Sequence, residues 1–135
     1  MSNNKTIQSE NTSDSISTVA GLPEPVLKVV RIAQTKKASD VIVLDLRESE
    51  AFTDFFVIFS AENTRQVKAI VNAIEEIFLQ SHLKPSHVEG SKHAEWLLMD
   101  FFDFVVHVFT HEARNFYGLE RLWVNAERIE VNQND

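Results

Sequence analysis

Cysteine is absent from the 135-residue sequence, and glycine and proline each occur only three times. Without cysteine, the chain can form no disulfide, no thiolate zinc site and no cysteine nucleophile. The three glycines are scattered at Gly21, Gly90 and Gly118. The sequence therefore contains neither a Walker phosphate loop nor the glycine fingerprint of a Rossmann dinucleotide site.

Long apolar runs are also missing, and no stretch of eighteen apolar residues occurs anywhere in the sequence. We therefore expect no membrane-spanning segment. Residues 1–21 are rich in Ser, Thr and Asn, have no apolar centre and no Arg, and include Glu10 and Asp14. This composition argues against a secretory signal or an organelle transit peptide. We predict a cytoplasmic protein with a disordered polar tail over 1–21, one domain over 22–125 and a polar C-terminal tail over 126–135.

The sequence does have a large apolar content and an acidic excess. Hydrophobic residues make up 44% of the chain, and 13 Lys and Arg against 20 Asp and Glu give a formal net charge of −7. This size and composition predict one packed domain. Nucleic-acid binding through a phosphate-neutralising surface needs clustered Lys and Arg, so the charge favours a basic protein as the partner instead.

Two helices are predicted from hydrophobic residues at helical spacing. The first begins near Leu22 and ends at 36–39, and Val26, Val29, Val30 and Ala33 form its apolar face. The second begins at Asn63, where Gln66 three residues later completes a capping-box pattern. Its apolar residues recur with helical spacing as far as Phe78, which makes it the clearest amphipathic helix of the chain.

Three strands are predicted at 40–46, 53–61 and 87–90. The first two are aliphatic or aromatic on both faces, as strands covered on both sides are. A sequence that alternates helices with such strands predicts an α/β fold, in which a mixed β-sheet is packed with helices in a small single domain.

The segment EWLLMDFFDFVVHVF predicts a β-hairpin with a tight turn at 101–102. If Asp100 lies opposite Asp103, Trp96 pairs with His107 on one face, and the other face is almost wholly apolar. We therefore expect the apolar face to point into the core. The face that carries Trp96 and His107 is expected to be a half-exposed binding surface.

The stretch ARNFYGLERLW, residues 113–123, predicts a further helix, which Gly118 weakens. The apolar stripe of this helix consists of Phe116, Leu119, Leu122 and Trp123. Tyr117 lies about a quarter turn away from that stripe. We therefore expect Phe116 and Trp123 in the core, whereas Tyr117 and Trp96 are of the residue types most enriched at binding hot spots.

The sequence gives only weak evidence for a catalytic or metal site. Asp45 and Asp54 could hold Mg²⁺ in a metal-dependent nucleotidyltransferase, but Asp residues at strand ends more often form turns and caps, and a phosphate loop is missing. His107 and His111 would lie about 13 Å apart on a strand, which is too far to share a metal ion. We predict no catalytic residue, no metal site, no cofactor and no enzymatic activity.

Several segments in this order resemble the ribosomal silencing factor family, also called the Iojap family: LDLRESEAFTDFFVI, NTRQVKAI, VEGSKHAEWLLMDFFDFVVHVF and HEARNFYGLERLW. The resemblance covers roughly Val26 to Trp123. It implies a domain similar to a degraded nucleotidyltransferase fold that binds the large ribosomal subunit through ribosomal protein L-fourteen. Such binding blocks joining of the small subunit and slows translation when nutrients run short.

The resemblance also assigns the interface to a Trp and a Tyr, which are Trp96 and Tyr117 in this sequence. The partner-binding residues that we predict are Trp96, Asp100, Phe101, His107, Tyr117 and Leu119. Family members have been seen as homodimers, which the sequence itself neither supports nor excludes. A homodimeric scaffold without a ribosomal role is therefore the alternative to the metal-dependent enzyme and the ribosome-binding protein.

Two positions depart from the family pattern. The family hairpin usually reads Asp-Tyr-Gly-Asp, whereas this chain has Phe102 in place of the glycine. A positive φ is cheap for glycine and strained for phenylalanine, so the turn geometry is expected to differ or to be strained. Gly118 replaces a residue that is commonly acidic, which we expect to loosen the helix that carries Tyr117.

Overall fold

The computed structural model describes residues 18–135, which fold around one six-stranded mixed β-sheet. The strands are β1 (Ser39–Asp45), β2 (Phe55–Ala61), β3 (His87–Gly90), β4 (Trp96–Asp100), β5 (Phe104–Thr110) and β6 (Glu127–Val131). Their order in the sheet is β3-β4-β5-β2-β1-β6, in which β2 and β5 are parallel and all other neighbours are antiparallel. The predicted α/β domain with a mixed sheet is confirmed.

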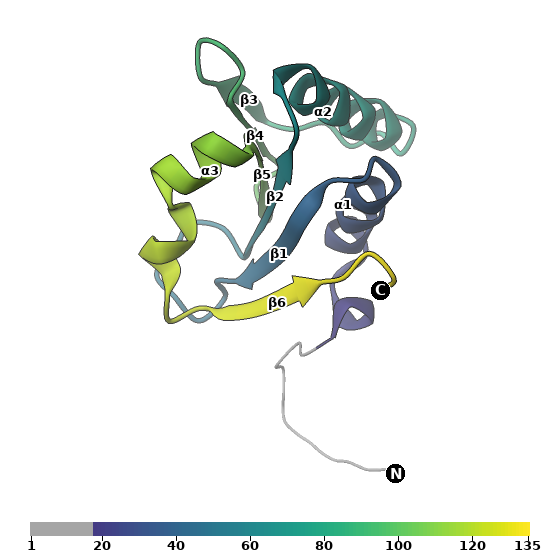
Figure 1. Cartoon of the computed structure of the whole chain (residues 1–135). Coiled ribbons are helices and arrows are strands. Elements are labelled where there is room, and N and C mark those ends of the chain that lie inside the picture. Colours follow the sequence, from purple (N-terminus) through teal and green to yellow (C-terminus); the bar gives the residue numbers. More distant parts are fainter. Residues whose placement is uncertain (1–17) are drawn as a thin grey trace.

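Helices cover the two faces of this sheet unequally. The helical elements are α1 (Glu24–Thr35), α2 (Thr64–Leu79), α3 (His111–Tyr117) and the 3₁₀ turns η2 (Val19–Gly21) and η3 (Leu119–Trp123). The long helices α1 and α2 lie on one face, and the short elements α3 and η3 lie on the other (Figure 1). No helix within residues 18–135 is long and apolar enough to cross a membrane.

The two long helices form as the sequence predicts. The expected apolar face of α1 is buried, and Pro25 occupies its first turn, where a missing N–H is tolerated. At the start of α2, Asn63 Oδ1 accepts the Gln66 N–H at 2.8 Å. The Gln66 side chain in turn accepts the Glu62 N–H at 2.6 Å, one residue earlier than in the standard capping box. The predicted N-cap is therefore confirmed.

The predicted hairpin forms from β4 and β5, but its register differs by two residues. Trp96 pairs with Phe109, and His107 pairs with Leu98. The side chain of Phe101 is buried in the α1/α2 core and stacks on Phe104 at 4.8 Å, so the turn moves one residue forward, to 102–103. Because a shift of two residues preserves the face of every side chain, Trp96 and His107 still share one face.

Both ends of the domain differ from the predicted bounds. The predicted polar tail over 126–135 is wrong, because Glu127–Val131 form β6, which pairs with β1 and buries Ile129. At the other end Val19 is only 8% exposed and belongs to the α1/α2 core, so the domain includes residues before Leu22. The rest of the predicted N-terminal tail, 1–17, lies outside the described residues.

The predicted continuous helix over 113–123 is wrong. Helix α3 ends at Tyr117, and Gly118 takes a left-handed conformation with φ of 55°. A glycine in this conformation is a common helix terminator, because it lacks the Cβ atom that makes positive φ costly. The chain then continues as η3, in which no residue is fully buried.

Candidate protein-binding site

Trp96 and Tyr117 lie side by side, although they come from different elements. Trp96 is the first residue of β4 and pairs with Phe109 near the end of β5, and α3 follows β5 directly. This topology places the Trp96 ring 4.8 Å from the Tyr117 ring, centroid to centroid. Trp96 is half-buried and Tyr117 is 45% exposed. The two aromatics that the sequence singled out therefore form one partly exposed cluster.

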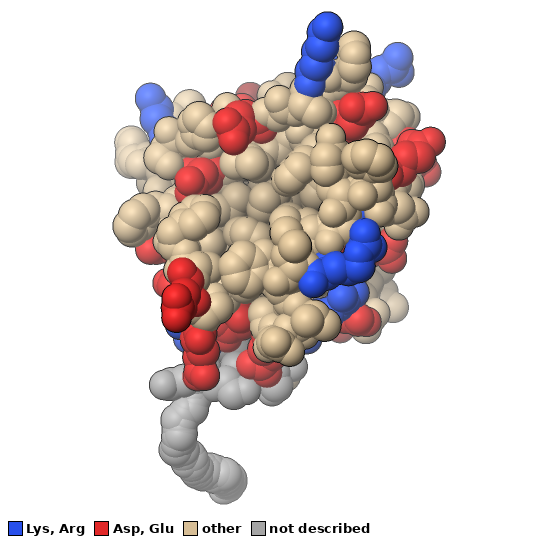
Figure 2. Space-filling model, turned by 90° about the vertical axis from the view of Figure 1, so that its left-hand side faces the viewer, with Lys and Arg blue, Asp and Glu red and all other residues tan. Residues whose placement is uncertain are grey.

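Phe116 extends this cluster, contrary to its predicted place in the core. Its side chain is 79% exposed and meets the Tyr117 ring edge-to-face at 5.0 Å. The expectation was wrong because it assumed a continuous helical stripe, which the break at Gly118 removes. We call Trp96, Phe116 and Tyr117 the α3 surface. Figure 2 shows the α3 side of the molecule, where a broad uncharged area is bordered by acidic and basic side chains.

His107 was expected on a half-exposed surface, but it lies buried beneath Trp96. Its side chain is 4% exposed, and its Nδ1 accepts a hydrogen bond from the Trp96 indole N–H at 3.1 Å. The Phe56 ring packs against the imidazole at 4.5 Å. Because an indole N–H can only donate, the His107 Nδ1 carries no proton and the neutral ring is protonated at Nε2. His107 thus holds the orientation of Trp96.

Burial of His107 also disfavours its charged form. Desolvation lowers the pKa of His107 from its ordinary value of 6.5 to about 4. The imidazole is therefore neutral at physiological pH, which is the state that can accept the hydrogen bond from Trp96.

The remaining predicted partner-binding residues are not part of the α3 surface. Asp100 is half-buried at the other end of β4, where its Oδ1 accepts the Phe102 N–H at 2.8 Å. Phe101 is 7% exposed and lies in the core on the opposite face of the sheet. Leu119 is half-buried and packs against the core beneath α3. The structure therefore gives these three residues roles in the turn and in the two cores.

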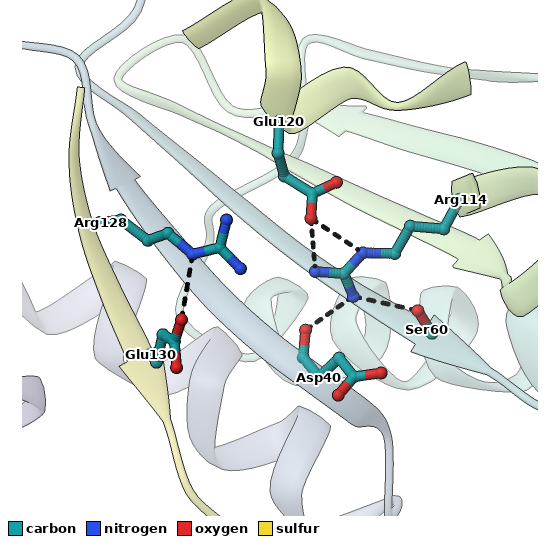
Figure 3. A network of polar contacts seen from close by, with 6 residues as sticks. All are labelled: Asp40, Ser60, Arg114, Glu120, Arg128 and Glu130. Atoms are coloured by element: carbon teal, nitrogen blue, oxygen red, sulfur yellow. Dashed lines mark hydrogen bonds and ion pairs between the residues drawn. The ribbon is translucent and has the colours of Figure 1, made fainter. Parts of the chain in front are cut away.

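A buried arginine, which the sequence analysis missed, fixes the position of α3. Arg114 is 9% exposed and donates hydrogen bonds to Ser60 Oγ at 3.0 Å and to the Asp40 carbonyl oxygen at 2.6 Å. Its guanidinium also pairs with Glu120 at 3.0 Å (Figure 3). Asp40 has φ of 51° beside an irregularity in the pairing of β1 with β2. This contact ties α3 and η3 to β1 and β2.

An open polar cavity of about 790 Å³ lies beside Arg114. Arg121, Arg128 and Glu130 also line it, and Arg128 pairs with Glu130 at 3.3 Å (Figure 3). None of the six predicted partner-binding residues lines this cavity. It is therefore separate from the α3 surface.

Of the two carboxylates considered for metal binding, Asp45 is already engaged by an arginine. Both Asp45 oxygens accept hydrogen bonds from Arg47, at 3.0 and 2.8 Å. Burial acts to raise the pKa of Asp45, but the hydrogen bonds and charge of Arg47 outweigh it and hold the pKa below the ordinary value of 3.8. Asp54 is exposed. Within residues 18–135, no three His, Asp or Glu residues are arranged to hold a metal ion.

The sequence of this chain matches a known protein family and several of its members. The sequence model of the family described as "Ribosomal silencing factor during starvation" matches residues 20–135. The ribosomal silencing factor of Bacillus subtilis is 34% identical over 102 residues, covering 75% of this chain and 86% of that protein. The mouse protein named "Mitochondrial assembly of ribosomal large subunit protein 1" is 32% identical over 100 residues, covering 70% of this chain and 43% of its own length.

Solved structures show the same fold. A Bacillus halodurans protein superimposes with a TM-score of 0.67 at 31% identity and covers 82% of this chain and 99% of that one. A Chromobacterium violaceum protein gives a TM-score of 0.68 at 28% identity and covers 73% of this chain and 82% of that one. The sequence match and the structural match therefore extend over most of the same domain.

Proposed function

The chain belongs to the ribosomal silencing factor family, and from this membership we propose that it binds the large ribosomal subunit through ribosomal protein L-fourteen. In this proposal the bound protein blocks joining of the small subunit and so represses translation in the cytoplasm under nutrient limitation. The protein acts as a binding partner and not as an enzyme. Self-association of the free chain stays a prediction from the family resemblance.

The observation that carries this proposal is the α3 surface. Trp96 and Tyr117 come from β4 and α3 and lie 4.8 Å apart, partly exposed and next to the exposed Phe116. A cluster of large aromatics at the surface is typical of the centre of a protein interface. The net charge of −7 complements a basic ribosomal protein and would accelerate its association.

Co-sedimentation with separated ribosomal subunits tests the proposal. We expect the wild-type protein to sediment with large subunits and not with small ones, and to bind isolated L-fourteen. Preincubation with large subunits should then lower the yield of joined ribosomes when small subunits are added. Binding to small subunits alone, or unimpaired subunit joining at saturating protein, would contradict it.

A further inference from the structure

A second pair of exposed aromatics lies at the opposite end of β5 from the α3 surface. Phe52 is 78% exposed in the segment before β2, and Phe102 is 74% exposed in the turn before β5. Because β2 and β5 are parallel neighbours, the segments that lead into them meet at one end of the sheet. The Thr53 hydroxyl donates to the Phe102 carbonyl oxygen at 2.9 Å, and the Asp54 N–H donates to the Asp103 carbonyl oxygen at 3.0 Å.

Phe102 has a backbone conformation that is unusual for a phenylalanine. Its φ is 77°, in the left-handed region that favours glycine, and an Asp100 oxygen holds its N–H there. A phenylalanine at this position is strained, and a side chain that is 74% exposed gains little from packing. The exposed Phe102 ring is therefore available for a contact outside the domain.

The charged side chains on these two segments are almost all negative. The exposed carboxylates on the same two segments are Glu48, Glu50, Asp54 and Asp103. The one cation on these segments is Arg47, whose guanidinium pairs with Asp45 at 2.8 Å and lies over the Phe55 ring at 5.3 Å. We call Phe52, Phe102 and these four carboxylates the turn surface.

We propose that the turn surface binds a basic protein segment of the large ribosomal subunit that also carries an aliphatic or aromatic side chain. Carboxylates around exposed aromatics suit a cationic partner whose apolar groups contact the rings, and they repel a phosphate backbone. This inference rests on the proposed ribosome binding and adds a second contact to the one at the α3 surface. The seven residues of β5 separate the two surfaces by about 20 Å, which lies within the extent of an interface of standard size.

The Phe102→Gly variant tests whether the Phe102 side chain is needed for binding or is only an unfavourable residue in the turn. The substitution relieves the positive-φ strain, so we expect a higher urea midpoint, yet about tenfold weaker binding to purified large subunits. Phe52→Ser should weaken binding to a similar degree with little change in the urea midpoint. Leu79→Ser is the matched control, because Leu79 is also exposed, at 53%, and lies outside the turn surface, as the last residue of α2.

The outcomes are distinct from those that test the proposed function. If wild-type protein fails to bind large subunits, both proposals fall. If the wild type binds, and Phe102→Gly and Phe52→Ser bind equally well, the turn surface alone is rejected.

Neutralising the charges tests the kind of partner. Glu48→Gln with Glu50→Gln should slow association with large subunits and leave the urea midpoint nearly unchanged. Faster or tighter binding of this variant would indicate ribosomal RNA at the turn surface and would overturn the assignment of a basic protein segment. Binding to isolated L-fourteen, measured in parallel, shows whether that segment belongs to L-fourteen or to a neighbouring protein.

Discussion

The two faces of the sheet are covered by very different amounts of helix. One face lies beneath α1 and α2, of 12 and 16 residues, and its core holds most of the fully buried side chains. The other lies beneath α3 and η3, of 7 and 5 residues, and its core is smaller. The aromatic side chains on the first face are buried, whereas on the second face Trp96 and Tyr117 are partly exposed to solvent.

This difference indicates how the domain separates stability from binding. A continuous core under long amphipathic helices supplies most of the hydrophobic free energy of folding. The incompletely covered face can then present aromatic side chains without loss of the fold. Because α3 is short, polar contacts help to hold it on the sheet. Arg114 makes these contacts with Ser60, Asp40 and Glu120.

The largest difference is expected between a core residue of α2 and an aromatic of α3. Ile74 is fully buried, so Ile74→Ala should lower the free energy of unfolding by about 2 to 5 kcal/mol. Phe116→Ala, which removes a larger but 79% exposed side chain, should change it by about 0.5 kcal/mol or less. Urea unfolding of both variants measures this contrast, and equal losses would show that Phe116 is a core residue after all.

Removing the anchor of α3 should have the next largest effect. Arg114→Met leaves Glu120 without its ion-pair partner and the Asp40 carbonyl without its donor, so we expect a loss of about 3 kcal/mol. Arg128→Met is the matched control, because it breaks an exposed pair with Glu130 that contributes about 1 kcal/mol or less. Similar urea midpoints for the two variants would show that Arg114 does not anchor α3.

The buried His107 should make stability depend on pH. Its pKa is about 4 in the folded protein and 6.5 when solvated, so the unfolded chain binds the proton more readily between these values. The stability that the neutral His107 contributes is fully present above pH 6.5. As the pH is lowered toward 4, the free energy of unfolding falls by at most about 1.4 kcal/mol per pH unit.

Comparison with His107→Asn isolates this contribution, because the amide oxygen can still accept from Trp96 but does not titrate. Urea unfolding between pH 7 and 4.5 should show a shallower pH dependence for the variant than for the wild type. Identical slopes would mean that His107 is not kept neutral by the fold.

A smaller effect is expected at the break between α3 and η3. Gly118→Ala forces a Cβ onto a residue with φ of 55°, which should cost about 1 kcal/mol. The added Cβ would also displace the Arg121 guanidinium, which lies directly against Gly118. Thermal unfolding measures the loss. An unchanged or raised melting temperature would show that the left-handed break is not required by the fold.

Hydrophobic periodicity predicted the well-covered face and failed on the other. The valines of α1 and the Asn63 cap follow from local rules, and the faces of Trp96 and His107 follow from strand alternation. The exposure of Phe116 does not, because it depends on where Gly118 breaks the helix. Strand β6 was missed because Ile129 is its only buried residue and its pairing with β1 is non-local.

The candidate site was predictable only in its two aromatics. Family resemblance and position outside the apolar stripe both pointed to Trp96 and Tyr117, and the structure brings them together. The burial of His107 could not be predicted from the pattern of its strand, because it depends on how Phe56 and Trp96 pack against the imidazole. Arg114 looked like any charged helix residue, since its partners Asp40 and Ser60 are distant in sequence.

The most direct test of the α3 surface is the affinity of Tyr117→Ala for purified large ribosomal subunits. Tyr117 is 45% exposed, so the variant should fold with a urea midpoint close to that of the wild type. Binding should weaken by about 2 kcal/mol or more, a factor of roughly 30, as expected for a central interface aromatic. A folded Tyr117→Ala variant that binds large subunits as tightly as the wild type would contradict the assignment of the α3 surface as the ribosome-binding site.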